Sequence, residues 1–317
     1  MASEAVSSEL PNFPTKTLGG SQFWSDELVF HHWRIQRNAL TDHYRLLDEK
    51  DFRRAWGTFA QCREKLEEIK REQRLPPMKG RAVVTLHGLI RSRDTMAGIG
   101  EFLEQEGDYT WLNVSYASTR RNLDEHAASL ARVIEHLEGI DEINFVCHSL
   151  GNLVVRRYLG EADQPQPRWK VDRRIKRLVM LGPPNNGAQI AELFKNNKLF
   201  GLVLGPSGKQ LANTWNDMQQ RLATPGFEFG IIAGRGNAVA TNPIVAGEDD
   251  LVVSVEETKL AGACDFLVVP LWHGELMYDT RVRESTLRFL QDGCFVSPDE
   301  RQPLPALSER PREGAAR

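Results

Sequence analysis

The chain has 317 residues, of which 41% are hydrophobic and 26% charged, so it can bury one large core of the size usual for a single α/β domain. Its formal net charge is −3, and its basic runs are short and interleaved with acidic residues. This balance gives no electrostatic footprint for nucleic acid, which we exclude as a partner.

The cysteine pattern and the hydropathy indicate the compartment. Four cysteines lie far apart without a C-x-x-C spacing, which predicts neither a zinc site nor a disulfide framework and favours a reducing compartment. Residues 1–17 lack a basic start followed by an apolar run, and no stretch approaches the ~18 consecutive apolar residues of a membrane span. We therefore expect a cytoplasmic protein without an integral membrane segment.

Residues 1–79 are expected to form a separate N-terminal region. Its beginning, to about Gly20, is rich in Ser, Pro and Gly, which predicts a loose arm. Between Glu49 and Arg74 apolar residues recur at helical spacing opposite a charged face, and Pro76-Pro77 ends the pattern. We expect a helical extension that braces the core; a partner-binding or substrate-gating role is the alternative.

A buried strand over 81–86 opens the core and ends in His87-Gly88-Leu89. Taken alone, this step is a glycine turn after a strand. The chain continues with a helix over 95–106, a strand over 109–116 and a long amphipathic helix over 122–137. This alternation of strands and helices predicts a mostly parallel sheet.

The next strand is the one around which the other elements can be placed. Ile143, Phe145 and Val146 are apolar and partly β-branched, as in a strand covered on both faces. Helical spacing begins at Leu150, so only one sharp turn separates strand and helix, and Ser149 stands at its apex. The Leu150 amide, at the helix N-terminus, is therefore expected to face any anion that forms on a bound substrate.

The pentapeptide Cys147-His148-Ser149-Leu150-Gly151 resembles the nucleophile elbow G-x-S-x-G of the α/β-hydrolase superfamily. Cys147 replaces the first glycine, at a position that needs a small side chain. The resemblance implies that Ser149 is the nucleophile. In the lipase and esterase branch the His-Gly step after an early strand positions the second oxyanion donor, which implies the Leu89 amide beside that of Leu150. An ordinary turn containing serine is the alternative interpretation of the pentapeptide alone.

The segment after the elbow helix is predicted to build a cap. A strand over 175–181 runs into a Pro-Asn-Gly turn, which resembles bacterial lipases, where this loop opens the cap region. Residues 188–225 are irregular and partly apolar, so we expect a cap-like insertion that covers an acyl pocket; ordinary helical packing is the alternative. Gly208-Lys209 lacks the other residues of a phosphate loop, which excludes nucleotide binding.

The same resemblance implies a triad acid between the next two strands. A strand over 227–233 precedes an acidic loop, and aligning Val253-Ser254-Val255 with the family pattern gives Asp250 as the acid. Leu251 replaces the usual glycine of that pattern, which leaves Asp249 as the second candidate.

The histidine of the triad can be chosen by its order in the chain. His273 follows the last strand, over 265–269, and is the only one of the eight histidines after Ser149. The order Ser, Asp, His can therefore be completed in one way. A final helix over 279–291 closes the predicted domain, and the Pro-, Glu- and Arg-rich residues 293–317 are expected to be disordered.

Residues 80–292 thus resemble the α/β-hydrolase fold, with a mostly parallel central sheet and helices on both faces. The resemblance implies hydrolysis of a small-molecule carboxylic ester through an acyl-enzyme, with Ser149 as nucleophile, His273 as base and Asp250 orienting the imidazole. This chemistry requires no metal and no organic cofactor. Acyl transfer or thioester cleavage by the same triad is one alternative. The other is a non-catalytic binding module with the N-terminal aromatic segment as its interface.

Overall fold

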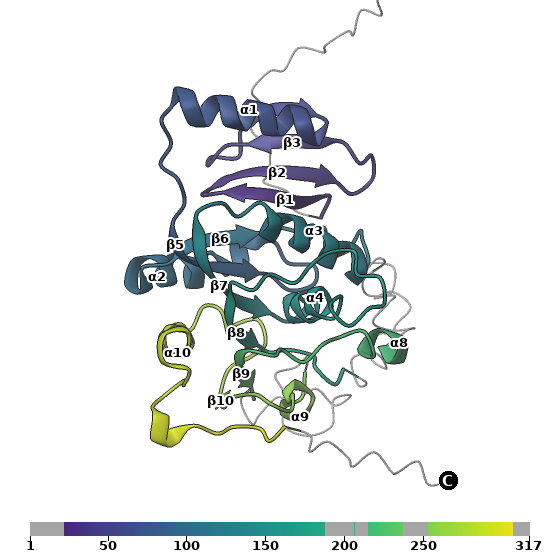
Figure 1. Cartoon of the computed structure of the whole chain (residues 1–317). Helices are drawn as coiled ribbons and strands as arrows, with labels where there is room; N and C mark the ends of the chain where they lie inside the picture. Colours follow the sequence, from purple (N-terminus) through teal and green to yellow (C-terminus); the bar gives the residue numbers. More distant parts are fainter. Residues whose placement is uncertain (1–21, 188–205, 207–214, 237–252, 307–317) are drawn as a thin grey trace, which may run out of the picture.

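The computed structural model describes residues 22–187, 206, 215–236 and 253–306, which contain two sheets (Figure 1). The larger sheet has six strands, all parallel to their neighbours. From one edge to the other its strands are β6 (Thr110–Val114), β5 (Gly80–Leu86), β7 (Ile140–His148), β8 (Ile175–Leu181), β9 (Glu228–Gly234) and β10 (Asp265–Val269). Parallel neighbours need long crossover connections, which is why helices alternate with these strands.

Helices cover both faces of this sheet. The helices described after β5 are η1 (Arg93–Met96), α2 (Ala97–Gly107), α3 (Leu123–Glu135), α4 (Leu150–Leu159), α8 (Trp215–Gln219), α9 (Val255–Thr258), α10 (Thr280–Asp292) and η2 (Pro298–Glu300). α3 packs beside α4 on one face, and α2 packs beside α10 on the other. The expected mostly parallel sheet with helices on both faces is confirmed. Within the described ranges, no helix combines the length and the apolarity needed to cross a membrane.

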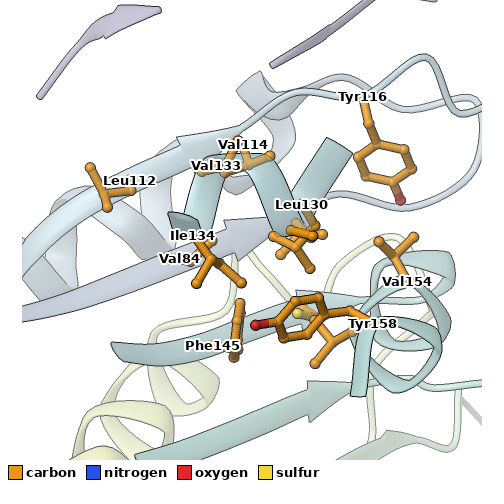
Figure 2. Packing of buried hydrophobic residues seen from close by; sticks show 14 of the residues in the cluster. Val84, Leu112, Val114, Tyr116, Leu130, Val133, Ile134, Phe145, Val154 and Tyr158 are labelled. Atoms are coloured by element: carbon orange, nitrogen blue, oxygen red, sulfur yellow. The ribbon is translucent and has the colours of Figure 1, made fainter. Parts of the chain in front are cut away.

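The core under α3 and α4 fixes the helix that follows the predicted elbow. Figure 2 shows Leu130 and Ile134 of α3 and Val154 and Tyr158 of α4 gathered around Phe145 of β7. Each of these side chains is at most 2% exposed. Burying an apolar side chain of this size contributes roughly 1.5–3 kcal/mol. α4 is therefore held firmly against the sheet, and so is its first turn beside Ser149.

Residues 22–79 form an antiparallel sheet with one helix, in place of the helical extension expected from the sequence. The elements are β1 (Trp24–Phe30), β2 (Trp33–Asn38), β3 (Tyr44–Leu47), β4 (Arg53–Gly57) and α1 (Phe59–Glu72). The helix expected from Glu49 begins only at Phe59, because Thr58 and Gln61 form a capping box there. Over the short stretch before Thr58, strand and helix spacing cannot be told apart, and pairing with β3 decides for a strand.

The small sheet meets the large one at the β6 edge, where β1 lies beside β6 (Figure 1). The Asp26 amide donates to the Ser115 carbonyl over 2.9 Å, and the Asp26 carboxylate accepts from the Ser115 amide over 2.7 Å. The same carboxylate accepts from Arg34 Nη1 (3.0 Å) and Gln36 Nε2 (2.8 Å), all in a buried setting. The junction thus places a buried, hydrogen-bonded Asp26–Arg34 ion pair beside the edge strand β6.

Replacing Asp26 by Asn is expected to lower the free energy of unfolding by about 3–5 kcal/mol, because the buried Arg34 guanidinium loses its counter-charge. Urea unfolding followed by circular dichroism measures this change. Glu67→Gln is the matched control, since Glu67 pairs with Lys70 at the surface, and it should shift the same quantity by less than about 1 kcal/mol. Equal effects of the two substitutions would contradict a stabilising role for the junction.

The segment 293–306 is ordered, contrary to the disorder expected from its composition. Phe295 is 1% exposed and its ring stacks on Phe289 of α10 at 4.8 Å. Asp265 accepts from the amides of Phe295 (2.7 Å) and Gln302 (2.9 Å), so a single buried carboxylate ties the segment to β10. A Pro- and Arg-rich composition does not reveal such a long-range acceptor. Residues 307–317 lie outside the described ranges.

Candidate active site

Ser149 lies at the turn between β7 and α4, and its backbone is strained. Its φ is 51° and its ψ is −118°. A positive φ is rare in residues other than glycine and persists only where the surrounding structure enforces it, often at functional sites. Here the Ser149 amide donates to the Leu181 carbonyl on β8 over 3.0 Å, and the packed α4 fixes the other side. The side chain is half-buried at the carboxyl edge of the large sheet.

The small residues around Ser149 allow a helix and a strand to approach closely. A Cβ at Gly151 would lie 2.8 Å from the Leu86 carbonyl oxygen and 3.0 Å from that of His87, so glycine is required there. Cys147, in place of the first glycine of the motif, is fully buried. Burial raises the pKa of the Cys147 thiol well above its usual value, so this cysteine packs and is not a competing nucleophile.

The loop after β5, which contains Gly88 and Leu89, lies close to Ser149. A Cβ at Gly88 would lie 3.2 Å from the Ser149 Cβ, so the two backbones are in close contact. The Gly88 carbonyl accepts from the Arg91 amide over 3.2 Å. Because the C=O and N–H of a trans peptide point in opposite directions, the Leu89 amide points away from these bonds. The Leu150 amide lies in the first turn of α4, where amides have no intrahelical acceptor.

His87 holds this loop in place through hydrogen bonds of its imidazole ring. Burial lowers the pKa of His87 to about 4, so the ring is neutral near pH 7. Its Nδ1 lies 2.8 Å from the Gly88 carbonyl and must donate the hydrogen bond, while its Nε2 accepts from the Tyr116 amide over 3.4 Å. The Tyr116 ring stacks on the imidazole at 4.3 Å. The histidine of the His-Gly step therefore fixes the orientation of the Gly88–Leu89 peptide.

His273 lies in the loop after β10 and is 8% exposed. It reaches the turn region through Gly182, which directly follows β8. A Cβ at Gly182 would lie 3.0 Å from His273 Nδ1, and the φ of Gly182 is 52°, so both space and backbone favour glycine. Since the Ser149 amide bonds to Leu181, the histidine ring and the serine flank the same strand end. The role of Gly182 was not predicted from the sequence, where its position directly after a strand was the available signal.

His148 lies between the Leu89 loop and His273. Its Nε2 donates to the His273 carbonyl over 2.9 Å, and the two rings are 4.6 Å apart. A Cβ at Gly88 would lie 2.9 Å from His148 Nδ1, so the ring fills the space beside that glycine. Burial, together with the neighbouring His273, holds the pKa of His148 well below its usual value. A neutral His148 thus separates the Leu89 loop from His273. Local sequence patterns do not reveal its contact with His273.

The two candidate acids, Asp249 and Asp250, lie outside the described residues, as does most of the expected cap-like insertion. The described chain resumes at Val253, and α9 follows it. The Asn186 amide donates to the Glu257 carbonyl over 3.0 Å, which ties α9 to the loop after β8. Among the described residues, no three His, Cys, Asp or Glu side chains are grouped as a metal site would require.

A parallel sheet with helices on both faces and a strained serine at a strand-to-helix turn constitutes the α/β-hydrolase fold. No protein-family model and no curated protein sequence matches the chain. Among solved structures, the mature form of the lipase BlEst2 from Bacillus licheniformis is 17% identical, with a TM-score of 0.47 over 66% of this chain and 90% of that chain.

The propeptide form of the same lipase gives a TM-score of 0.48 and 17% identity over 65% of this chain, and the present chain spans 50% of its length. Est1E from Butyrivibrio proteoclasticus is 18% identical, with a TM-score of 0.44 over 69% of this chain and 90% of that chain. Likeness at this level does not identify a substrate.

Proposed function

We propose that the chain is a serine hydrolase that cleaves a small-molecule carboxylic ester, with Ser149 as the nucleophile. The observation that carries the proposal is the strained backbone of Ser149 at the first turn of α4, beside the Leu89 loop. Maintaining a positive φ at a serine costs stability, and such strain is typical of sites where a side chain must be presented for chemistry.

In the proposed reaction His273 takes the proton of Ser149 as the hydroxyl oxygen attacks the ester carbonyl carbon. The carbonyl electron pair moves onto oxygen, and the Leu89 and Leu150 amides stabilise this oxyanion. Collapse of the tetrahedral intermediate breaks the bond to the alcohol, which receives the proton from His273 and leaves an acyl-enzyme. Asp250 is the residue proposed to hold the imidazole tautomer and to stabilise its positive charge.

The second half repeats these steps with water. His273 removes a proton from water, whose oxygen attacks the acyl-enzyme carbonyl, and collapse returns the proton to Ser149 and releases the acid. Both steps require His273 to become positively charged. The neighbouring His148 favours this, because its buried ring stays neutral and adds no second charge.

The cellular compartment and the type of bond that is cleaved also form part of the proposal. The four cysteines are free, and three of them are buried, which agrees with a reducing, cytoplasmic compartment. The same machinery would serve thioester cleavage or acyl transfer, which differ only in the leaving group and in the acceptor that replaces water.

The test is labelling by a fluorophosphonate probe together with a series of p-nitrophenyl esters of increasing acyl length, with thioesters and amides alongside. We expect labelling and a preference for esters. Each added methylene that is buried should stabilise the transition state by up to ~0.8 kcal/mol, which raises kcat/KM about fourfold, until the acyl pocket is full. A flat response would remove the acyl pocket and leave the nucleophile intact. Absence of both hydrolysis and labelling would overturn the proposed function in favour of a binding module.

A further inference from the structure

The loop that carries Leu89 contains a second strained residue, Ile90. Its φ is 64°, in the left-handed region that a β-branched side chain rarely adopts. The Ile90 side chain is 46% exposed, so packing contributes little to holding this conformation. Strained backbone persists only where other contacts enforce it, and these contacts must therefore be hydrogen bonds to the loop.

Two of these bonds come from outside the loop. The Ile90 amide donates to the Ser118 hydroxyl over 3.1 Å, and the Arg91 carbonyl accepts from Gln22 Nε2 over 3.0 Å. They hold the peptide groups on either side of the Ile90 carbonyl. Because Ile90 directly follows Leu89, a change in its φ would rotate the peptide next to the proposed oxyanion donor.

A single side chain of the N-terminal region connects both bonds. Gln22 Oε1 accepts from the Ser118 hydroxyl over 3.0 Å, and from the Thr119 amide over 3.1 Å and the Thr119 hydroxyl over 2.7 Å. The Ser118 hydroxyl thus donates to Gln22 while it accepts from the Ile90 amide. Gln22 uses both ends of its amide, one on the loop directly and the other on the residue that holds the loop.

The N-terminal sheet fixes Gln22 in turn. Gln22 lies two residues before β1, and the Ser25 hydroxyl of β1 accepts from the Ala117 amide over 3.1 Å. One residue further, Asp26 forms its two hydrogen bonds with Ser115. Three points of attachment therefore align the start of β1 with the segment 115–119, which lies between the small sheet and the Leu89 loop.

We propose that Gln22 is a positioning residue for catalysis: through Ser118 and the Arg91 carbonyl, the N-terminal sheet holds the Leu89 amide in its oxyanion-binding orientation. The inference rests on the proposed function. The N-terminal region would then contribute to stabilisation of the transition state. A region that only braced the core would affect the stability of the fold and leave kcat unchanged. An oxyanion donor acts only when it lies 2.7–3.1 Å from the developing charge, so a small rotation of the loop is sufficient to weaken it.

The test compares Gln22→Ala and Ser118→Ala with the wild-type enzyme on a p-nitrophenyl ester. We expect kcat to fall roughly 10-fold with KM unchanged, since loss of a whole donor costs about 10²- to 10³-fold and here the donor is displaced. The inhibition constant of an alkylboronic acid, whose tetrahedral adduct on serine requires the oxyanion donors, should rise by the same factor. Thr58→Ala is the control: it removes the α1 cap in the same region, and should lower the melting temperature without changing kcat.

A second variant separates positioning from folding. Glycine adopts a positive φ without strain, so Ile90→Gly introduced into Gln22→Ala should recover at least half of the lost factor in kcat. Full activity of Gln22→Ala and Ser118→Ala, or a loss that glycine at position 90 does not recover, would overturn the inference. In either case a wild-type enzyme that hydrolyses esters leaves the proposed function standing, whereas an inactive wild type with unlabelled Ser149 refutes that function itself.

Discussion

Replacing Ser149 by alanine is expected to lower kcat/KM for ester hydrolysis by about 10⁴- to 10⁶-fold and to abolish labelling by the fluorophosphonate probe. The hydroxyl is the proposed nucleophile, and no other described group offers one at the turn, because the Cys147 thiol is buried with a raised pKa. Residual activity should remain, since the Leu89 and Leu150 amides can still polarise a bound carbonyl.

The fold should tolerate this change. Alanine meets the same backbone strain at φ 51° as serine does, and the half-buried side chain contributes little packing. Ser129→Ala on α3 is the matched control and should be labelled normally. His273→Ala should lose nearly as much activity, and the double variant little more than either single one, because members of a triad act as a unit. Normal labelling of the Ser149→Ala variant would show that Ser149 is not the nucleophile.

The large sheet was predictable because its strands are short apolar runs that end in turn residues. The strand expected over 175–181 is β8 (Ile175–Leu181), and that expected over 265–269 is β10 (Asp265–Val269). In β8 the run from Leu178 to Leu181 is apolar and buried throughout, which is the pattern of a strand covered on both faces. The sharp turn at Ser149 was predictable for the same reason, since strand and helix spacing meet there without an intervening loop.

The N-terminal sheet was not predictable from local spacing. β2 and β3 are short and mix apolar with charged residues, because one face of each strand carries a buried polar network. Arg34 and Gln36 are buried with partners that include Asp26, whose carboxylate accepts from both of them. From the sequence alone such residues are predicted to be solvent-exposed. A charged side chain can be buried when a partner pairs with it, and that partner is not found among its neighbours along the chain.

The contacts that assemble the candidate site share this limitation. The His148 bond to His273 joins residues 125 positions apart, and the Gln22 bond to Ser118 joins residues 96 positions apart. Neither periodicity nor turn chemistry encodes a pairing at such separation. The sequence could therefore nominate the groups that react, while the groups that position them became visible only in the folded chain.

The identity of the triad acid is the second large effect, and Asp250→Asn is expected to lower kcat by about 10³- to 10⁴-fold. An asparagine in this role stabilises the wrong imidazole tautomer and cannot support the positive charge on His273. Asp249→Asn should retain kcat within about tenfold, as expected for a residue outside the triad. Both assays use the same ester, and circular dichroism of each variant verifies folding.

The prediction for Asp250 depends on how the acidic loop is aligned with the family pattern, and the two Asp→Asn variants test this alignment. Asp250 precedes the described Val253 by three residues in the chain. Val253 is buried, and α9 just after it is tied to the loop that contains Gly182, the residue against which His273 packs. Only the alignment through Val253-Ser254-Val255 distinguishes the two acids, and it favours Asp250. If Asp249→Asn is the inactive variant and Asp250→Asn the active one, the register is off by one residue, because Leu251 then does not correspond to the usual glycine.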